Sequence, residues 1–398
     1  NGGTAVPADW ALTAAGWDES NPAAGTYALS ENGPIGYTRT SLTCSNSAGE
    51  VDSVTLGIGE SVSCTFINDD IPPSLTLQKT VVNDNGGTAV AGEWTVKAIG
   101  PVSLSGSGTG TSSGPGLQAG TYGLSETGPP GYDAGDWICS GDGQSDGTSI
   151  TLDIGESASC VVTNDDIEPS LTLVKDVLNN NGGTADGSAW ALSATGPAGF
   201  SGQGPIVSND PGFQAGLYDL SETGGVAGYQ PSAWNCAGGV QNDSDSVNVS
   251  IRQHVNCTIT NDDIGPGLTL IKQVVNDNGG TAVASEWTLT ARGPTGFSGP
   301  GPVVANISEL EAGAYTLSES DGPDGYSSTG WNCSGGIQVD NTIALGTGET
   351  ATCTIVNDDI SPSLILEKTV VNDNGGTKVA ADWMLTASGP TDFSGNGP

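Results

Sequence analysis

Basic residues are scarce in this sequence: 9 Lys and Arg stand against 45 Asp and Glu, for a formal net charge of -36. Because nucleic acids and anionic membranes attract positive charge, neither is expected as a partner. The only His is His254, and no Cys-x-x-Cys pair is present, which argues against a zinc site. The sequence also lacks a nucleophile elbow and a phosphate-binding loop, so an enzyme acting on an external substrate is not expected.

Long apolar runs, a signal peptide and any segment with a helical period are missing as well. We therefore expect an all-β fold and no direct membrane contact in this segment. Gly and Pro are abundant, with 62 and 22 residues, and this abundance alone would suggest disorder. Trp, Tyr and Val nevertheless recur at fixed places, which favours ordered, turn-rich β-structure.

A repeated pattern organises the chain. It begins Leu-Thr-Leu, ends Asn-Gly-Gly-Thr at residues 75–88, and returns at 171–184, 268–281 and 364–377 with small changes. The Asn before Gly-Gly is spaced by 84, 96, 97 and 96 residues, at Asn1, Asn85, Asn181, Asn278 and Asn374. Such a period predicts a tandem array of all-β domains, each about the size of one β-sandwich.

The expected domains follow from this period. A partial repeat without its first strand covers 1–71, complete repeats cover 72–167, 168–264 and 265–360, and a partial repeat with only its first strands covers 361–398. Because the outer copies are partial, we expect an excerpt of a longer surface or secreted polypeptide. The short, Pro-bearing linkers predict a semi-rigid, elongated rod of domains.

The eight cysteines occur as one pair per repeat, with partners separated by 20 or 21 positions: Cys44 and Cys64, Cys139 and Cys160, Cys236 and Cys257, Cys333 and Cys353. Regular pairs of this kind indicate disulfides and therefore an oxidising, extracellular or cell-surface location.

Three polar residues end otherwise apolar strand faces. Alternate residues of a strand share a face, so Lys79 lies with Leu75 and Leu77, Glu126 with Tyr122 and Leu124, and Asn164 with Cys160 and Val162. The next copies supply Lys175, Glu222 and Asn261, then Lys272, Glu319 and Asn357. Buried charges must pair or react, because burial of an unpaired charge is costly.

Two interpretations of these trios are open. In a low-dielectric site a Lys tends to lose its proton and a Glu to gain one. The neutral amine can then attack the Asn side chain while the carboxylic acid polarises it and passes protons to the leaving ammonia, which yields a Lys-Asn isopeptide bond. The alternative is a buried Lys-Glu salt bridge capped by the Asn.

These residues resemble the B-type repeats of collagen-adhesin proteins and the domains of pilins. The resemblance lies in the Lys at the end of the first strand, in Tyr-x-Leu-x-Glu followed by Pro-x-Gly-Tyr at 315–326, and in the Asn of the last strand. It implies prealbumin-like, immunoglobulin-like sandwiches that stack into stalks on bacterial surfaces, with the Lys, Glu and Asn roles given above. The cysteine pair is an addition to that pattern.

Adjacent carboxylates stand before each linker, in the motif Asn-Asp-Asp. Hard oxygen ligands suit calcium, so a tentative calcium site is predicted at each pair: Asp69 and Asp70, Asp165 and Asp166, Asp262 and Asp263, Asp358 and Asp359. A solvated acidic turn is the alternative. The Asn-Gly-Gly segment at 83–87 also resembles a calcium loop, but a plain Asn-Gly hairpin turn is favoured because Asn180 replaces Asp84 in one copy.

The leading functional hypothesis is a structural stalk or filament of a bacterial surface, whose partners are further repeats of the same chain and, in a filament, other copies. The second hypothesis is an adhesin that recognises a host, matrix or glycan ligand through variable loops such as 200–209 and 300–308. The recurring Trp residues are expected in the core rather than at a sugar site. Asn248 and Asn306 begin glycosylation sequons, a weak signal here.

Overall fold

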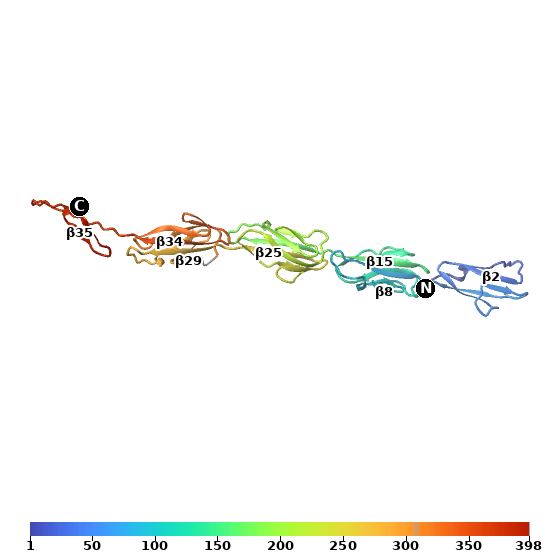
Figure 1. The fold of residues 1–398 in the computed structure, drawn as a ribbon. Helices are drawn as coiled ribbons and strands as arrows, with labels where there is room; N and C mark the ends of the chain where they lie inside the picture. Colours follow the sequence, from blue (N-terminus) through green and yellow to red (C-terminus); the bar gives the residue numbers. More distant parts are fainter. Residues whose placement is uncertain (307–308, 398) are drawn as a thin grey trace. The chain divides into compact units, whose positions relative to one another are not determined.

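The computed structural model describes residues 1–306 and 309–397. The described chain is nearly all-β and divides into two compact units: residues 1–176, 187–225 and 233–260 form one, and residues 177–186, 226–232 and 261–397 form the other. Along the sequence the strands fall into five sets, called repeats below, which Figure 1 shows in colours from blue to red. No helix in the described ranges has the length and apolar character needed to cross a membrane.

The first repeat has two small sheets, β1-β2-β4 and β3-β5. Its elements are η1 (Pro7–Asp9), β1 (Ala11–Ala14), β2 (Gly25–Asn32), β3 (Tyr37–Cys44), β4 (Ser53–Leu56) and β5 (Cys64–Asp70).

The second repeat is a sandwich of two sheets, ordered β11-β15-β6-β9 and β13-β14-β10-β7-β8, with β12 also paired to β15. Its elements are β6 (Ser74–Val82), η2 (Ala91–Glu93), β7 (Thr95–Ile99), β8 (Leu104–Ser107), β9 (Thr111–Ser112), β10 (Gly120–Thr127), β11 (Tyr132–Ala134), β12 (Ile138–Gly141), β13 (Gln144–Ser145), β14 (Ser149–Leu152) and β15 (Ser157–Asp166).

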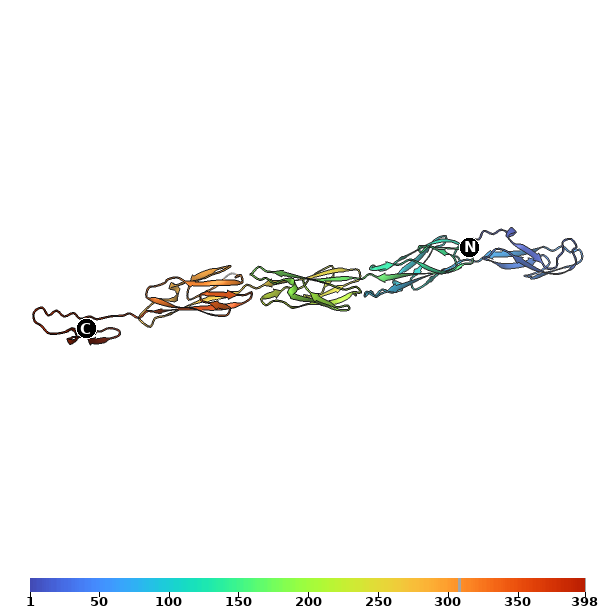
Figure 2. The same cartoon turned by 90° about the horizontal axis from the view of Figure 1, so that it is seen from above.

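The third repeat has the same two layers, ordered β19-β16-β25-β21 and β18-β17-β20-β24-β23, which are drawn in green in Figure 2. Its elements are β16 (Ser170–Leu178), η3 (Gly187–Ala189), β17 (Trp190–Thr195), β18 (Phe200–Gln203), β19 (Ile206–Ser208), β20 (Gly216–Gly224), β21 (Tyr229–Pro231), β22 (Asn235–Ala237), β23 (Val240–Gln241), β24 (Ser246–Val249) and β25 (His254–Asp263).

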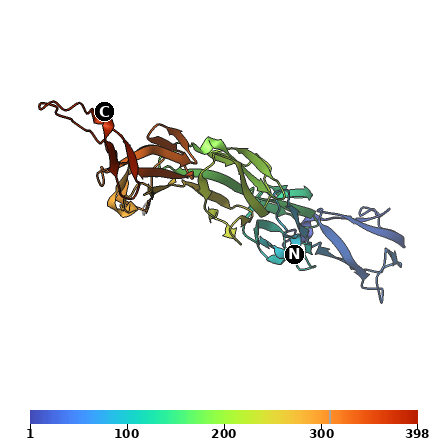
Figure 3. The same ribbon diagram turned by 60° about the vertical axis from the view of Figure 1, so that its left-hand side comes forward.

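The fourth repeat follows the same order, with sheets β29-β26-β34-β31 and β28-β27-β30-β33-β32. Its elements are β26 (Gly267–Val275), η4 (Ala284–Glu286), β27 (Thr288–Arg292), β28 (Phe297–Pro300), β29 (Val303–Ala305), β30 (Gly313–Glu319), β31 (Tyr326–Ser334), β32 (Ile337–Val339), β33 (Thr342–Leu345) and β34 (Thr350–Asp359). The fifth repeat, at the red end of the chain in Figure 3, has η5 (Ala380–Asp382) and the hairpin β35 (Met384–Ala387) and β36 (Phe393–Asn396).

The cores form because strict alternation puts one face of each strand inside the sandwich. In β6, Leu75 and Leu77 are buried, and Tyr122 of the opposite sheet is fully buried against them. Trp94, Trp190 and Trp287 are also buried, so these side chains pack inside and do not present a sugar-stacking surface. The predicted β-sandwich array is confirmed by these paired sheets.

The hairpin turn predicted at 83–87 is wrong. β6 and β7, which flank it, belong to different sheets, so the segment crosses from one layer to the other. Both edges of β6 are already paired, with β15 and β9, and β7 pairs with β8 and β10. β6 and β7 therefore take their partners from different sheets and do not pair with each other as a hairpin would.

The segments predicted as variable ligand loops are also built differently. Residues 200–209 contain β18 and β19, which pair with β17 and β16, and the Val207 side chain is buried. Residues 300–305 repeat this arrangement, because they contain the last residue of β28 and the whole of β29, which pair with β27 and β26. Residues 307 and 308, which end the second predicted loop and the Asn306 sequon, lie outside the described residues.

Candidate functional site

Parallel pairing of the first and last strands brings the predicted Lys and Asn together. In the second repeat β6 runs parallel to β15, with Lys79 opposite Val162 and Asn164 opposite Val81. The two side chains therefore project from neighbouring strands on the same face, two residues apart in register. In the fourth repeat Lys272 and Asn357 occupy the same register positions on β26 and β34.

The Glu of each trio comes from the opposite sheet. Glu126 lies on β10, where it pairs with Val96 of β7. Its Oε2 atom is 2.7 Å from Lys79 Nζ. The equivalent distances are 2.7 Å for Lys175 and Glu222, and 2.8 Å for Lys272 and Glu319. Each site thus bridges the two layers of its sandwich.

The lysines at these sites are desolvated. The side chains of Lys79, Lys175 and Lys272 have no exposed surface, while the Glu side chains remain 11%, 13% and 14% exposed. Burial lowers the pKa of each Lys below its ordinary value, and the hydrogen bond and charge of the partner Glu oppose this shift without cancelling it. A lowered pKa makes the neutral, nucleophilic form of the amine more accessible.

A Trp ring covers each Lys ammonium; this Trp is the first residue of the strand that follows the 3-10 turn, or stands directly before that strand. The Nζ atom lies 5.1, 4.9 and 4.6 Å from the ring centroids of Trp94, Trp190 and Trp287. The same contact exists in the fifth repeat, where Lys368 Nζ lies 5.0 Å from the Trp383 ring. A ring face at this distance attracts the cation and excludes water from it.

In the second repeat the Asn also contacts the carboxylate: Asn164 Nδ2 donates to Glu126 Oε1 over 2.6 Å. Asn164 Oδ1 is buried and receives no hydrogen bond from the described residues, as is also true of Asn357 Oδ1. An unpartnered buried carbonyl costs about 1–3 kcal/mol. In this orientation Glu126 faces the amide nitrogen. With the Asn164 amide turned over, a protonated carboxyl would donate to Oδ1, which is the contact that an amide needs to become electrophilic. Asn261 is buried at the corresponding position of β25.

The first repeat shows the site without its amine. Asn68 Nδ2 donates to Glu31 Oε2 over 2.8 Å, so the Glu and Asn contact forms although residues 1–71 provide no Lys. The two side chains lie beside a groove with a volume of about 430 Å³, together with Trp10, Leu12 and Phe66.

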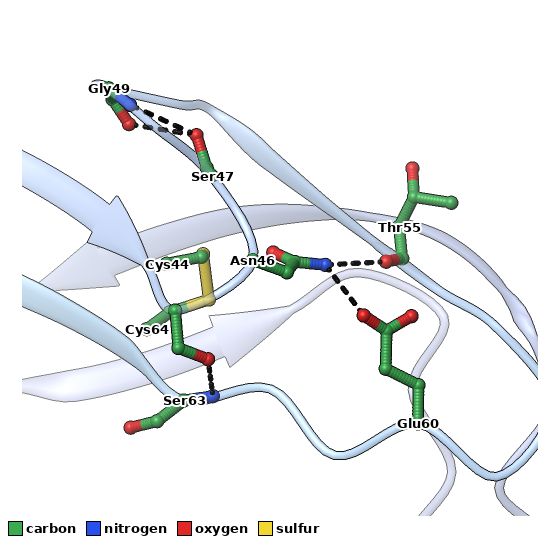
Figure 4. The surroundings of a disulfide bond; sticks show 9 residues. Cys44, Asn46, Ser47, Gly49, Thr55, Glu60, Ser63 and Cys64 are labelled. Atoms are coloured by element: carbon green, nitrogen blue, oxygen red, sulfur yellow. Dashed lines mark hydrogen bonds between the residues drawn. A yellow bond between two sulfur atoms is a disulfide. The ribbon is translucent and has the colours of Figure 1, made fainter.

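Four disulfides join the cysteine pairs: Cys44 with Cys64, Cys139 with Cys160, Cys236 with Cys257, and Cys333 with Cys353. Each joins directly opposite residues of two antiparallel strands, and one of them is the last strand of its repeat. Figure 4 shows the first of these disulfides with its neighbour Asn46, whose Nδ2 donates to the Thr55 carbonyl and to Glu60.

The second Asp of each Asn-Asp-Asp motif holds the Asn-Gly-Gly segment of its own repeat. Asp166 accepts hydrogen bonds from the backbone N–H groups of Asn85 and Gly87, at distances of 2.6–3.1 Å. Asp70, Asp263 and Asp359 make the corresponding contacts to residues 1–3, 180–183 and 277–280. The motif is therefore the end of a strand whose carboxylate anchors a loop, and the predicted acidic turn is wrong.

Sequence reasoning missed this anchor and the Tyr that completes it. The Tyr132 hydroxyl donates to Asn83 Oδ1 over 2.7 Å and accepts from the Ala89 N–H over 3.0 Å. The available signal was the joint recurrence of Asn-Gly-Gly, Gly-Tyr and Asn-Asp-Asp in the repeats. Repetition alone could not show that the three segments meet.

The first Asp of the motif contributes to two acidic clusters that could hold a metal ion. The carboxylates of Asp84, Asp165 and Asp166 lie within 4.8 Å of one another, as do those of Asp277, Asp358 and Asp359. The pKa of Asp84 is raised, first by loss of hydration and then by the charges of Asp165 and Asp166. The other predicted calcium ligands, Asp69, Asp70, Asp262 and Asp263, belong to no such cluster among the described residues.

Comparison with known proteins matches five segments of the chain to the family model described as a prealbumin-like fold domain: residues 1–66, 70–162, 166–259, 263–355 and 359–398. A search of the curated proteins finds no match.

Among solved structures, the Bacillus anthracis TIE protein is 14% identical, with 90% of this chain and 76% of that chain covered and a TM-score of 0.44. Two B repeat units of the Staphylococcus aureus collagen-binding protein are 14% identical, with coverages of 84% and 83% and a TM-score of 0.22. The major pilin of Streptococcus pyogenes is 15% identical, with coverages of 48% and 98% and a TM-score of 0.22.

Proposed function

Because the chain belongs to the family of prealbumin-like fold domains, we propose that it is a structural segment of an extracellular stalk or filament on a bacterial surface. Its partners are further repeats of the same chain and, in a filament, other copies. The observation that carries the proposal is the buried contact between Lys and Glu in three successive repeats, with an Asn on the last strand. A covalent bond at this place would suit a protein that transmits force.

The proposed reaction is an internal amide exchange. The neutral Lys79 Nζ attacks Asn164 Cγ, the Cγ–Nδ2 bond breaks, and the former amide nitrogen leaves as ammonia. Glu126, in its protonated form, donates to the Asn oxygen, accepts a proton from the attacking amine and returns a proton to the leaving nitrogen. No oxidant, metal or external substrate is consumed. The same roles are proposed for Lys175, Glu222 and Asn261, and for Lys272, Glu319 and Asn357.

The proposed bond has a mechanical consequence because it joins the first and last strands of a repeat. Force that enters at β6 would pass through the Lys79–Asn164 bond to the end of β15 and would not load the strands between them. The disulfides lie elsewhere on the last strand. Each closes a loop of about 20 residues and should add about 3 kcal/mol of stability in the chain-entropy model. Such crosslinks suit an oxidising extracellular location.

The intact mass of the reduced 398-residue chain tests the crosslinks. The wild-type protein should be lighter than its sequence by three molecules of ammonia, and the Glu126→Ala variant should have lost only two. Glu31→Ala is a matched control, because Glu31 contacts Asn68 in a repeat without the Lys, so this variant should still lose three. A reduced wild-type mass equal to that of the unmodified sequence would rule out the crosslinks.

We also propose that calcium binds at the Asp84 and Asp277 clusters, where three carboxylates converge and where Asp358 Oδ1 is buried without a hydrogen bond from the described residues. The third repeat offers a natural contrast because Asn180 replaces the corresponding Asp. Calcium should raise the melting temperature of the wild-type chain over that in chelator, and Asp84→Asn with Asp277→Asn should remove the difference. Equal melting temperatures of the wild-type chain under both conditions would exclude calcium.

We favour the stalk over the alternative of an adhesin, because residues 200–209 and 300–305, the segments expected to recognise a ligand, form paired strands at sheet edges. Replacing residues 209–212, which lie outside the strands between β19 and β20, should leave the fold intact and so provides a direct check on any ligand-binding role.

A further inference from the structure

The anchored Asn-Gly-Gly loop has a second contact, to the repeat that follows it. The carbonyl of its Asn accepts a hydrogen bond from the N–H of an Ala that precedes a core strand of the next repeat. This contact occurs three times, with distances of 2.9, 2.7 and 2.7 Å, between Ala119 and Asn1, Ala215 and Asn85, and Ala312 and Asn181. All three pairs lie inside one or the other compact unit.

The Ile of each linker makes a second pair of contacts at the same junction. The Ile167 N–H donates to the Gly131 carbonyl of the repeat that the chain leaves, over 3.0 Å. Its carbonyl accepts from the Arg252 N–H of the repeat that the chain enters, over 2.8 Å. Ile71 and Ile264 repeat this arrangement with Gly36 and Gly155, and with Gly228 and Gly348. Two separate segments of one repeat therefore hold the next.

The glycine of the loop is fitted to this contact. Gly86 has a φ of +90°, and a Cβ atom added to it would lie 2.7 Å from both the N and the O of Ala215. A Cβ at Gly182 would lie 2.7 Å from Ala312 N and 2.9 Å from Ala312 O. Gly279 has a similar φ of +99°, but a Cβ there would meet nothing within 4 Å. Space as well as backbone conformation therefore requires glycine at Gly86 and Gly182, whereas a Cβ at Gly2, which has a φ of +99°, would lie 3.3 Å from Ala119 N.

We infer that each Asn-Gly-Gly loop and linker Ile together form a docking surface whose partner is the next repeat of the same chain. The third repeat carries both halves of this contact: Asn181 accepts from Ala312 of the next repeat, and Ala215 donates to Asn85 of the previous one. Because the two halves lie on different elements, the same contact can be repeated along a series of repeats. Docking couples neighbouring repeats. At the junction of the second and third repeats, for example, loss of the docked surface frees the N–H groups of Ala215 and Arg252. The inference goes beyond the proposed crosslinks and holds whether or not they form.

Hydrogen exchange in the full 398-residue chain tests this surface. In the wild-type protein the Ala119, Ala215 and Ala312 amides should exchange at least about tenfold more slowly than in unstructured peptides, since their partners lie across the junctions. Gly86→Ala should speed exchange at Ala215 and Arg252 by about tenfold and leave Ala312 unchanged. Gly182→Ala should affect Ala312 and Gly348 instead.

Gly279→Ala is the matched control, because it imposes the same left-handed strain without meeting a following repeat. It should leave all three Ala amides protected. The proposal is overturned if the wild-type Ala amides exchange at unstructured rates, or if Gly86→Ala alters only its own repeat, as Gly279→Ala does. The wild-type measurement decides even if a variant fails to fold. Intact mass reports the crosslinks separately, so failure of one proposal is distinguishable from failure of the other.

Discussion

The Lys side chains at the three trios have an unusual environment for a charged group. Each is fully buried between a carboxylate and an indole ring, and burial lowers its pKa even though the Glu favours the ammonium form. A purely structural salt bridge would gain most if the Lys stayed charged. A lowered pKa eases loss of the proton that the proposed attack requires, and burial alone would lower the pKa of a salt-bridged Lys in the same direction.

This lowered pKa predicts how crosslinking depends on pH. Newly synthesised chain, kept unfolded in acid and then refolded at a chosen pH, should form the Lys79–Asn164 bond more slowly at high pH, because the attack needs a neutral Lys79 beside a protonated Glu126, and this pair holds the same single proton as the ion pair. Above the folded-state pKa of Lys79 the pair loses that proton, and the rate should fall about tenfold per pH unit. Because burial lowers this pKa, the fall should begin below the ordinary Lys value of 10.5. Peptide mapping of the crosslinked product over time measures the rate.

Asn164→Ala should form no product from the second repeat at any pH, which identifies the signal. A rate that begins to fall only at the ordinary Lys pKa would show that the buried environment does not lower the pKa of the amine.

At the scale of single elements, the loop at 83–87 depends on one distant carboxylate. Asp359 shows the electrostatics: burial opposes ionisation, but donation by the N–H groups of Gly280 and Asn278 is stronger, so its pKa is lowered. By the same geometry, Asp166→Ala should destabilise the second repeat by about 3 kcal/mol, as its charge-assisted hydrogen bonds are lost. The Asn85 and Gly87 amides should then exchange about a hundredfold faster.

Asp165→Ala is the control for this prediction, because the neighbouring Asp165 contributes charge to the cluster but no hydrogen bond to the loop in the described structure. It should leave both amides protected and bring the pKa of Asp84 closer to its ordinary value, since one repelling charge is removed. Equal exchange in the two variants would contradict an anchoring role for Asp166.

The contrast between the trios and this loop shows what could be predicted from the sequence. Period-two alternation places Lys79, Glu126 and Asn164 on interior faces, and the structure has them there. Alternation does not name strand partners, so the parallel pairing of β6 with β15 had to come from the structure. The Asp166 contact could not be predicted from the sequence, because its donors are backbone N–H groups about 80 residues away, which leave no signature in side-chain identity.

The short strands at the sheet edges could not be predicted from the sequence, for a different reason. Segments such as 104–112 are rich in Gly and Ser, which favour loops, yet β8 and β9 pair with β7 and β6. An otherwise exposed sheet edge presents unpaired backbone groups, and pairing them outweighs the weak strand propensity of the residues.

At the scale of the whole chain, the proposed bonds and the disulfides protect different lengths of polypeptide. A bond between Lys79 and Asn164 would shield about 84 residues of the second repeat from force applied at the chain termini. The Cys139–Cys160 disulfide, which lies inside that stretch, closes only 21 residues. The Lys79–Asn164 bond should therefore decide whether the repeat extends under force. The disulfide should only shorten the extension by the length of its own loop.

Single-molecule pulling on the full chain separates the two contributions. Under reducing conditions the wild-type second repeat should not lengthen, whereas in Glu126→Ala it should unfold with a gain of about 300 Å, at about 3.5 Å for each freed residue. Under oxidising conditions the same variant should gain about 70 Å less, because the disulfide keeps its loop closed. Glu31→Ala should match the wild-type protein in this repeat. A full gain in the wild-type repeat would mean that the buried trio transmits no force, since only an unbroken path from β6 to β15 can prevent that lengthening.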